Sequence, residues 1–559
     1  MMLAFVLLLA GTLGRYDAKT LRNGQAQAAD SALTRRVDSV FVAWSRTSTP
    51  GCAVGVDTGG VPLFRRAYGM ANLETATPWT VGTISESGSV AKQFTATALV
   101  LLARDGVLSL DDDITRWIPE AKGVGRKITI RHLLTHTSGF PDRYLLHEAE
   151  GRPAGEVDHP NAEVLDVVSR LRNLNFDPGE DYLYSNTGFI LAATIVERAS
   201  GYSLQKFTDG RMFRPLGMSS TRWREDHRDV VPGRASAYSG NPVAGFRNDH
   251  PFTRVIGSGG LNTTVGDFLK WQAALQKGDA PWGAVRDSLE RVGRLNDGTE
   301  LTYALGLTVD RWRGLRRVSH TGSTGGYRAA LYRYPDQNVA VALLCNAGAI
   351  NPGDIASRVS ALVLGASLAA VAAEPDAAPV DTAVLSGLAG IYRAPRTGEV
   401  MILSLREGRL ADSTAGNATL TPIGSGTFKY RNSARTITVV PGSAGAPAGL
   451  VVRAPNTRAV EYQAVERPRL DAAGLAAYAG DYASPELGAR YRLVLRSDTL
   501  LLDQGWRGSE PLRAIFRDGF ELGSVGIARF TRDSRGRITG FEIWAGRVRH
   551  LRFDRVPAR

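Results

Sequence analysis

Glu86-Ser87-Gly88-Ser89-Val90-Ala91-Lys92 opens the helical stretch around which the rest of the chain can be interpreted. It contains Ser89 and Lys92 as a Ser-x-x-Lys unit at an expected helix start. Residues three apart lie on one helix face, so the amine of Lys92 can reach the hydroxyl of Ser89. A serine hydroxyl becomes a good nucleophile when a base removes its proton, and burial favours the neutral amine that such a base requires. By itself the pattern also fits a solvated helix face, so its meaning depends on the other motifs.

The charge of the chain is scattered rather than clustered. Its 559 residues contain 67 Lys and Arg against 55 Asp and Glu, which gives a formal net charge of +12. This length predicts several domains. Because no basic run with interleaved aromatic residues occurs, we expect no nucleic-acid partner, and the charge better suits weak attraction to anionic envelope polymers.

The first residues form an apolar run, Leu3 to Ala10, that is too short to span a membrane and suits the core of a signal peptide. Ala26-Gln27-Ala28 offers a cleavage site of small residues, although no Lys or Arg precedes the apolar run. We therefore predict a signal peptide over residues 1–28, a protein exported to the periplasm or beyond, and no integral membrane segment in the mature chain.

The chain contains two cysteines, Cys52 and Cys345, and both lie in apolar, strand-like runs. Two cysteines cannot form a disulfide framework. Two buried free thiols are the expected state, and a single bridge between neighbouring strands is the alternative.

Two more motifs carry polar residues of catalytic types. Tyr184 and Asn186 follow a turn, and in an extended segment their side chains point the same way. Asn186 or Thr187 is expected to cap a helix over residues 188–200. Farther along, His320-Thr321-Gly322-Ser323 lies on an expected edge strand.

His132 and His136 are spaced as two zinc ligands on a helix would be. A zinc site needs a third ligand, and no general-base Glu lies between these two histidines. We therefore expect them to shape a loop near the rim of the active site, and we predict no metal and no organic cofactor.

Apolar strands at both ends of a mostly helical segment indicate an α+β domain over residues 29–365, with helices packed on one antiparallel sheet. An alanine-rich linker with two prolines is expected over 366–383. Beyond it, Ala389-Gly390-Ile391-Tyr392 matches Ala479-Gly480-Asp481-Tyr482 at an offset of 90 residues. This repeat predicts two small, closed, antiparallel β-barrels of lipocalin-like type, over 384–467 and 468–559.

Together, Ser89/Lys92, Tyr184/Asn186 and His320/Gly322 resemble the serine β-lactamase and penicillin-binding superfamily in its class C-like branch. The resemblance covers roughly residues 30–365 and implies an acyl-serine hydrolase. It implies that Ser89 attacks the substrate carbonyl while Lys92 and Tyr184 shuttle the proton, with Tyr184 as a phenolate-like base.

The same resemblance implies that Asn186 binds the substrate amide and that the backbone N–H groups of Ser89 and Ser323 form the oxyanion hole. His320, Thr321 and Gly322 complete the implied substrate-binding set. His320 stands where β-lactamases carry lysine, and a neutral histidine supplies no fixed cation for a substrate carboxylate, which disfavours an efficient β-lactamase.

A catalytic domain followed by two barrels is similar to D-aminopeptidases, in which a barrel loop enters the cleft. The candidate loops here are Pro441 to Gly449 and Asp503 to Glu510, although the barrels could also act as binding or spacing modules. The expected function is that of a D-aminopeptidase or a DD-carboxypeptidase-like enzyme, acting on small peptides, D-amino-acid amides or esters. The alternatives are a β-lactamase, a carboxylesterase, and a catalytically silent protein that binds peptidoglycan or peptides.

Overall fold

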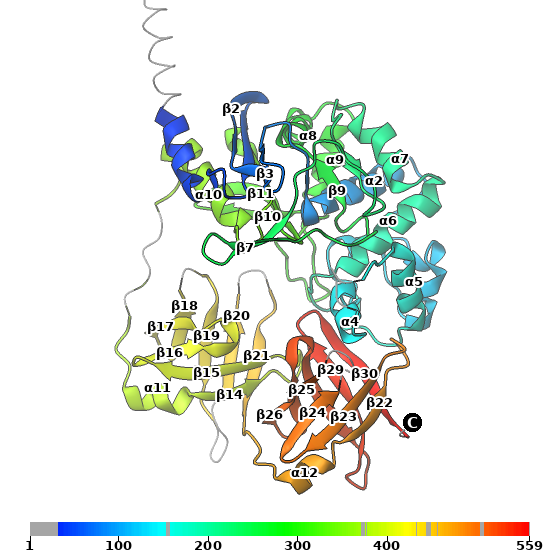
Figure 1. Cartoon of the computed structure of the whole chain (residues 1–559), viewed down its shortest axis with the longest axis vertical. Helices are drawn as coiled ribbons and strands as arrows, with labels where there is room; N and C mark the ends of the chain where they lie inside the picture. The colour runs from blue at the N-terminus through cyan, green and yellow to red at the C-terminus, as the bar shows by residue number, and fades with distance from the viewer. Residues whose placement is uncertain are drawn as a thin grey trace, which may run out of the picture.

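Six antiparallel strands form the sheet at the centre of the N-terminal part of the chain (Figure 1). The computed structural model describes residues 32–557 apart from 153–156, 371–374, 376, 432, 443–448, 455–456 and 504–507. The strand order is β10-β11-β12-β13-β1-β2, with bounds Thr308–Trp312, Leu315–Thr324, Tyr327–Tyr334, Val339–Cys345, Cys52–Thr58 and Val61–Tyr68. The predicted α+β fold is confirmed. Strand β10 pairs only with Leu315–Ser319 of β11, so among the described residues the stretch from His320 to Thr324 pairs with β12 alone and is an edge, as predicted.

Both faces of this sheet are covered, as the alternation along β13 shows. Val341 and Leu343 belong to one buried cluster, whereas Ala342 and Leu344 belong to another. Successive side chains of a strand point to opposite faces, so a strand that is buried throughout needs helices on both sides. The helix over residues 32–40 and α10 (Pro352–Leu364) cover one face, and α2 (Lys92–Arg104), α6 (Asn186–Ser200) and α8 (Val265–Lys277) lie on the other.

Smaller elements surround this core. The remaining helices of the N-terminal part are α3 (Ile130–Leu134), α4 (Arg143–Ala149), α5 (Asn161–Arg170), α7 (Leu204–Thr208) and α9 (Trp282–Leu289). Short strands form three small sheets: β3 (Met70–Asn72) with β4 (Thr77–Pro78); β5 (Ser85–Glu86) with β9 (Leu261–Thr263) and β6 (Arg222–Trp223); and β7 (Tyr238–Asn241) with β8 (Gly245–Asn248).

The expectation of two free thiols is wrong. Strands β1 and β13 are neighbours in a register that places Cys52 directly opposite Cys345, and the two sulfur atoms form a disulfide. The apolar surroundings of both cysteines were visible in the sequence, but the register that pairs them was not.

The C-terminal part consists of two antiparallel β structures. The first is a closed barrel of eight strands, β14–β21: Gly390–Arg393, Val400–Arg406, Arg409–Asp412, Ala418–Gly424, Thr427–Tyr430, Thr436–Val440, Gly449–Arg453 and Val460–Val465. The second is a nine-stranded, nearly closed barrel, β22–β30: Gly480–Ala483, Arg490–Arg496, Thr499–Asp503, Ser509–Pro511, Arg513–Phe516, Gly519–Leu522, Gly526–Arg532, Ile538–Ala545 and Val548–Val556.

The internal repeat is confirmed, because β14 and β15 correspond in position to β22 and β23. A short helix precedes each barrel, α11 (Thr382–Leu388) and α12 (Ala472–Ala476). The prediction of two closed barrels is only partly right, since no pairing closes β25 onto β26 within the described residues.

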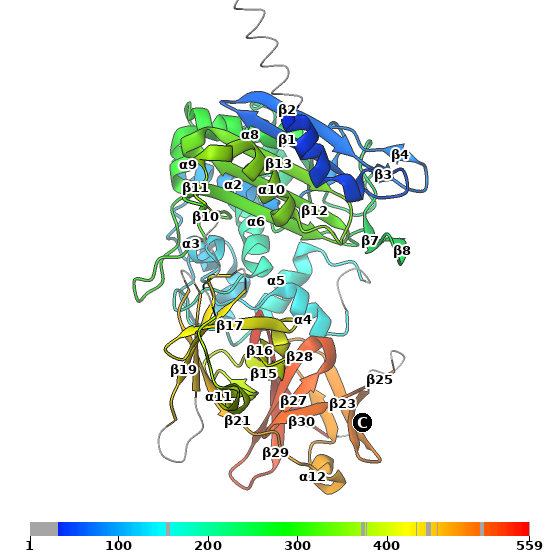
Figure 2. The ribbon, with the colours of Figure 1, turned by 90° about the vertical axis from the view of Figure 1, so that its left-hand side faces the viewer.

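The second barrel packs directly on the N-terminal part of the molecule. Its core residues join the same hydrophobic cluster as α2 and α6, whereas the first barrel has a core of its own. The hydroxyl of Tyr491 donates to the carbonyl of Ala149 at the end of α4, and Figures 1 and 2 show this barrel beside α4 and α5. The hairpin between β29 and β30 is thereby brought to the edge of the catalytic domain.

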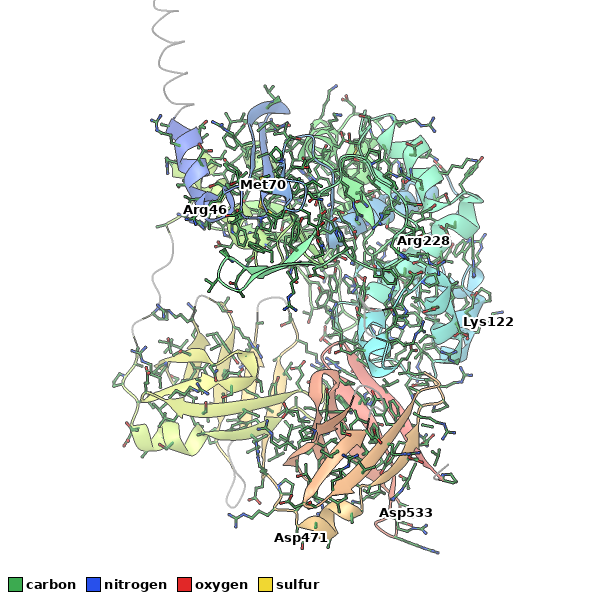
Figure 3. The ribbon with its side chains drawn as sticks, in the orientation of Figure 1. Arg46, Met70, Lys122, Arg228, Asp471 and Asp533 are labelled. Carbon is green, nitrogen blue, oxygen red and sulfur yellow. A yellow bond between two sulfur atoms is a disulfide. The ribbon has the colours of Figure 1, made fainter. Side chains whose placement is uncertain are left out.

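Charged side chains are dispersed over the outer surface, as expected from the sequence. Arg46, Lys122, Arg228, Asp471 and Asp533 lie far apart at the periphery of the catalytic part and the second barrel (Figure 3). Within the described ranges, no helix combines the length and the apolar character needed to cross a bilayer. The predicted signal peptide lies outside the described residues, as does part of the predicted linker.

Candidate active site

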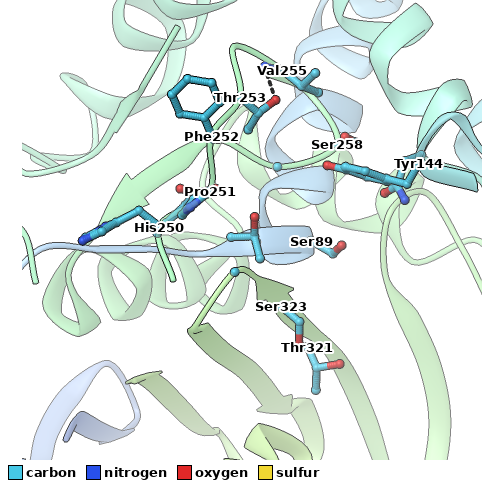
Figure 4. A pocket seen from close by; sticks show the side chains of 18 of the residues that line it. Ser89, Tyr144, His250, Pro251, Phe252, Thr253, Val255, Ser258, Thr321 and Ser323 are labelled. Carbon is cyan, nitrogen blue, oxygen red and sulfur yellow. Dashed lines mark hydrogen bonds between the residues drawn. The ribbon is translucent and has the colours of Figure 1, made fainter. Parts of the chain in front are cut away.

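A cavity of about 490 Å³ opens where the sheet, the helices and the second barrel meet. Figure 4 shows residues that line it around Ser89. Seven of the eight predicted site residues line it: Ser89, Tyr184, Asn186, His320, Thr321, Gly322 and Ser323. The eighth, Lys92, is fully buried and lies directly behind Ser89. Three segments that are far apart in the sequence therefore converge at one place.

Ser89 and Lys92 are held at the junction of two helical segments. Ser89 belongs to the 3-10 turn Gly88–Ala91, and Lys92 is the first residue of α2. The amine nitrogen of Lys92 lies 3.1 Å from Ser89 Oγ, 2.8 Å from Asn186 Oδ1 and 2.7 Å from the carbonyl oxygen of Ser258. A neutral amine has two hydrogens, which Asn186 and Ser258 can accept, and its lone pair then faces the hydroxyl of Ser89.

Burial determines the protonation states of Lys92 and Tyr184. Desolvation lowers the pKa of the Lys92 amine well below 10.5, and the nearby Arg547 lowers it further, whereas Asp142 opposes the shift. Desolvation also raises the pKa of the Tyr184 phenol, which a hydrogen bond with Ser89 partly offsets. The amine nitrogen lies 4.9 Å from the centre of the Tyr184 ring. These directions favour a neutral lysine beside a neutral tyrosine.

Both the oxygen and the nitrogen of the Asn186 side-chain amide form hydrogen bonds within the protein. Its Oδ1 accepts from Lys92, while its Nδ2 and its backbone N–H both donate to Asp142 Oδ2, at 2.9 and 2.8 Å. The expectation that Asn186 or Thr187 caps α6 is wrong, because the N-cap is Ser185 and it makes no side-chain cap. The side chain of Asn186 serves the polar network of the cavity instead.

His320 is a neutral histidine with a defined tautomer. Its Nδ1 lies 2.6 Å from the Thr321 carbonyl, which can only accept, so this nitrogen carries the proton. Its Nε2 therefore accepts from the Tyr303 hydroxyl at 2.9 Å. Burial lowers the pKa of His320 to about 4, and Lys92 adds to the shift. The strand position that lysine occupies in β-lactamases thus carries no charge here at neutral pH.

His132 and His136 shape the neighbouring loop. His132 forms a capping box with Thr129 at the start of α3. His136 adopts a positive φ of 59°, accepts from the backbone N–H of Ser185, and packs against Tyr184 in a tilted arrangement with ring centres 4.1 Å apart. It thereby supports the segment that presents Tyr184.

Two glycines let the Ser89 turn lie directly against strand β11. A Cβ on Gly322 would lie 2.0 Å from the Ser87 carbonyl oxygen and 3.0 Å from Ser89 N. A Cβ on Gly88, which has a φ of +50°, would lie 2.6 Å from Ser323 N. Only residues without a side chain allow these backbones to approach so closely. The contact places the backbone nitrogens of Ser89 and Ser323 on the same side of the cavity.

The second barrel contributes a cation to the cavity. Arg547, at the tip of the β29–β30 hairpin, lines the cavity, and its Nη1 lies 3.3 Å from Asp142 Oδ2. Its guanidinium lies 5.5 Å from the ring centre of Tyr184. The backbone N–H of Asp142 and the amide of Asn175 donate to the Arg547 carbonyl at 3.1 and 3.0 Å.

Both loops predicted to enter the cleft contain residues outside the described ones, 443–448 in the first and 504–507 in the second. Sequence reasoning missed Arg547, Asp142, Tyr303 and Tyr144, which belong to no recognisable motif. Tyr144 and Ser258 flank Ser89 in Figure 4, and the segment from His250 to Val255 lies across the cavity from them.

The fold and the cavity are those of a serine hydrolase, and this chain belongs to the beta-lactamase family, whose model matches residues 27–364. It is 32% identical to penicillin-binding protein 4* of Bacillus subtilis (strain 168) over 311 residues, which are 52% of this chain and 66% of that protein. The predicted family is therefore confirmed.

A second relative matches the barrels as well. The chain is 25% identical to a D-aminopeptidase of Brucella anthropi over 527 residues, which are 91% of this chain and 95% of that enzyme. Among solved structures, the octameric penicillin-binding protein homologue from Pyrococcus abyssi superposes with a TM-score of 0.53 at 21% identity, covering 79% of this chain and 99% of that one. That likeness supports the fold.

Proposed function

We propose that this chain hydrolyses small peptides, amides or esters of D-amino acids through an acyl intermediate on Ser89. The observation that carries this proposal is the buried Lys92 amine, 3.1 Å from Ser89 Oγ, in surroundings that lower its pKa. A neutral amine at that distance is a general base within reach of the proton it must remove.

The proposed chemistry begins with attack of Ser89 Oγ on the substrate carbonyl carbon, while its proton passes to Lys92 Nζ. The negative charge that develops on the carbonyl oxygen is stabilised by the backbone N–H groups of Ser89 and Ser323. The proton then moves through the Tyr184 hydroxyl to the leaving nitrogen or oxygen as its bond to carbon breaks. A water molecule then attacks the acyl carbon and gives its proton to Tyr184. Tyr184 passes a proton to Lys92, and Lys92 returns one to Ser89 Oγ as the bond between that oxygen and the acyl carbon breaks.

Tyr184 acts in this scheme as a neutral relay rather than as a resting phenolate, because burial raises its pKa. Asn186 holds the Lys92 amine through its Oδ1 and retains the second hydrogen of its Nδ2 for the substrate amide. His320, Thr321 and Gly322 form the opposite wall, where the substrate backbone would pair with the strand edge facing the cavity.

The choice of D-residues rests on similarity, since the match to a D-aminopeptidase extends through both barrels. The β11 wall of the cavity disfavours efficient β-lactam hydrolysis, because His320 supplies no fixed cation there at neutral pH. A chromogenic β-lactam and a simple acetate ester, assayed beside D-amino-acid substrates, distinguish the β-lactamase and carboxylesterase alternatives.

The guanidinium of Arg547 favours one version of this function. Its Nη1 pairs with Asp142, and the guanidinium also lines the cavity, where its charge attracts a substrate carboxylate and disfavours a substrate ammonium. This supports a DD-carboxypeptidase-like enzyme, whose substrate ends in a carboxylate, over an aminopeptidase that requires a free amino terminus. An acyl-D-Ala-D-Ala peptide and its C-terminal amide form the matched pair that separates the two versions.

The decisive assay compares D- and L-alanyl anilides and the acyl-D-Ala-D-Ala peptide with the full chain and with its Ser89→Ala variant. Turnover restricted to D-substrates and lost in Ser89→Ala is the expected result. Equal turnover of L-substrates would contradict the stereochemical claim. Failure of a serine-directed fluorophosphonate to label the protein would favour the catalytically silent binding protein.

Export is proposed as well, and it is supported by the apolar run from Leu3 to Ala10.

A further inference from the structure

A second cavity, of about 370 Å³, lies where the catalytic part and both barrels meet. The catalytic part contributes residues from Val124 to Arg126 and from Arg172 to Glu180, the first barrel contributes Arg396, and the second barrel contributes Arg549 and His550. Its volume falls in the range of small-molecule sites, about 300–1,000 Å³.

Arginine dominates the lining of this cavity. Four arginines line it, Arg126, Arg172, Arg396 and Arg549, against two acidic residues, Asp177 and Glu180. Three of these six charges belong to exposed pairs, Arg126 with Asp177 at 2.8 Å and Glu180 with Arg458 at 3.9 Å. Such exposed pairs contribute little energy and leave both partners accessible to a ligand.

The positive charges of the other three arginines are incompletely balanced. Arg396 and Arg549 share one carboxylate, Asp181, at 2.6 and 3.4 Å. The Arg172 guanidinium donates to the carbonyls of Ser169 and Leu171, and the carboxylate of Glu486 accepts from the Arg172 backbone N–H at 2.9 Å. Positive charge therefore exceeds negative charge at this junction.

Arg549 provides the most specific indication of a ligand. Its side chain is 5% exposed, yet its contact with Asp181 is long, and its Nε has no hydrogen-bond partner among the described residues. The Phe176 ring lies 5.8 Å from the guanidinium and stabilises it only in part. A buried guanidinium N–H without an acceptor is costly, and an oxyanion in the cavity would supply that acceptor.

We propose that this interdomain cavity binds a small anion with two or more carboxylate or phosphate oxygens. The anion would accept hydrogen bonds from Arg549 and neutralise the excess charge of Arg396 and Arg172. Arg549, which lines this cavity, belongs to the same β29–β30 hairpin as Arg547. Asn175 holds that hairpin through the Arg547 carbonyl and, at 2.7 Å, through the Arg549 backbone N–H. An anion bound here would thus hold the segment that enters the active-site cavity.

The test is calorimetric titration of the full chain with citrate and, separately, with inorganic phosphate, at ionic strength held constant with sodium chloride. We expect saturable binding of one anion per chain. Arg172→Gln is the main variant, because this exposed side chain forms no ion pair with the residues that the structure describes, and it should weaken binding about tenfold. Arg549→Gln should weaken binding at least as much.

Two controls define the site. Arg492→Gln removes an exposed cation of the second barrel that pairs with Asp481 outside the cavity, and it should leave binding unchanged. Arg547→Gln should also leave it unchanged, which separates this cavity from the active-site cavity. Citrate binding without phosphate binding would assign a carboxylate ligand, and the reverse would assign a phosphate ligand. Absence of saturable binding by both anions, or equal binding by Arg172→Gln, Arg549→Gln and the wild type, would overturn the proposal.

Discussion

Replacement of Lys92 tests whether the buried amine is the base that activates Ser89. Lys92→Met keeps the length of the side chain and removes the proton acceptor, and Lys92→Arg keeps a positive charge that cannot be removed at accessible pH. In both variants Ser89 Oγ loses the neutral amine that lies 3.1 Å from it in the wild type. General bases contribute about 10²–10⁴-fold to rates, so both variants should lose acylation activity by at least about 10²-fold.

The pH dependence of the wild type supplies a second, independent measure. The base must be neutral, so the acylation rate rises with pH through the pKa of Lys92 and then levels off. Because burial lowers that pKa well below 10.5, the plateau should be reached well below pH 10.5. With an ordinary lysine the rate would instead climb about tenfold per pH unit up to pH 10.

The assay is stopped-flow acylation by a D-amino-acid p-nitrophenyl ester from pH 5 to 10, with circular dichroism to verify folding of each variant. His320, with a pKa of about 4, should remain neutral over this range and add no inflection. A rate that still rises tenfold per unit at pH 9, or a folded Lys92→Met variant with more than about a tenth of wild-type activity, would refute the assignment of Lys92 as the base.

Three further predictions concern the cavity. Gly322→Ala should lower kcat about 10²–10³-fold, because its Cβ would lie 2.0 Å from the Ser87 carbonyl oxygen and displace the oxyanion donors. The control Gly266→Ala, whose Cβ has room, should leave kcat unchanged. Equal kcat values for the two variants would contradict this. Tyr184→Phe should slow leaving-group protonation about 10²–10⁴-fold, more for anilides than for activated esters, and identical losses on both substrate types would argue against the relay. Arg547→Gln should raise KM about tenfold for an acyl-D-Ala-D-Ala peptide but not for its amide, and a parallel change for both would remove the case for carboxylate recognition.

Most of the fold and the Ser-x-x-Lys motif could be predicted from the sequence. Local patterns were sufficient there: the 90-residue repeat aligns β14 with β22, the glycine after Ser200 ends α6, and the three motifs converge on one cavity. The roles assigned to these residues and the limits of the predicted domains stay predictions.

Contacts between distant segments could not be predicted in the same way. Arg547 meets Asp142 across 405 residues, and neither position belongs to a motif. The disulfide depends on the register between β1 and β13, which alternation within each strand does not fix. Asn186 looked like a helix cap because its residue type favours caps, but the buried Lys92 amine and the Asp142 carboxylate use its side chain instead.

The central claim is that Ser89 carries the acyl group. Its most direct test is acid-quenched intact mass and peptide mapping of the full chain during turnover of a D-amino-acid ester, beside Ser89→Ala. The account predicts an adduct with the mass of the acyl group on the peptide that contains Ser89, absent from a folded Ser89→Ala variant that no longer turns over. An adduct on another residue, or undiminished turnover by Ser89→Ala, would contradict it.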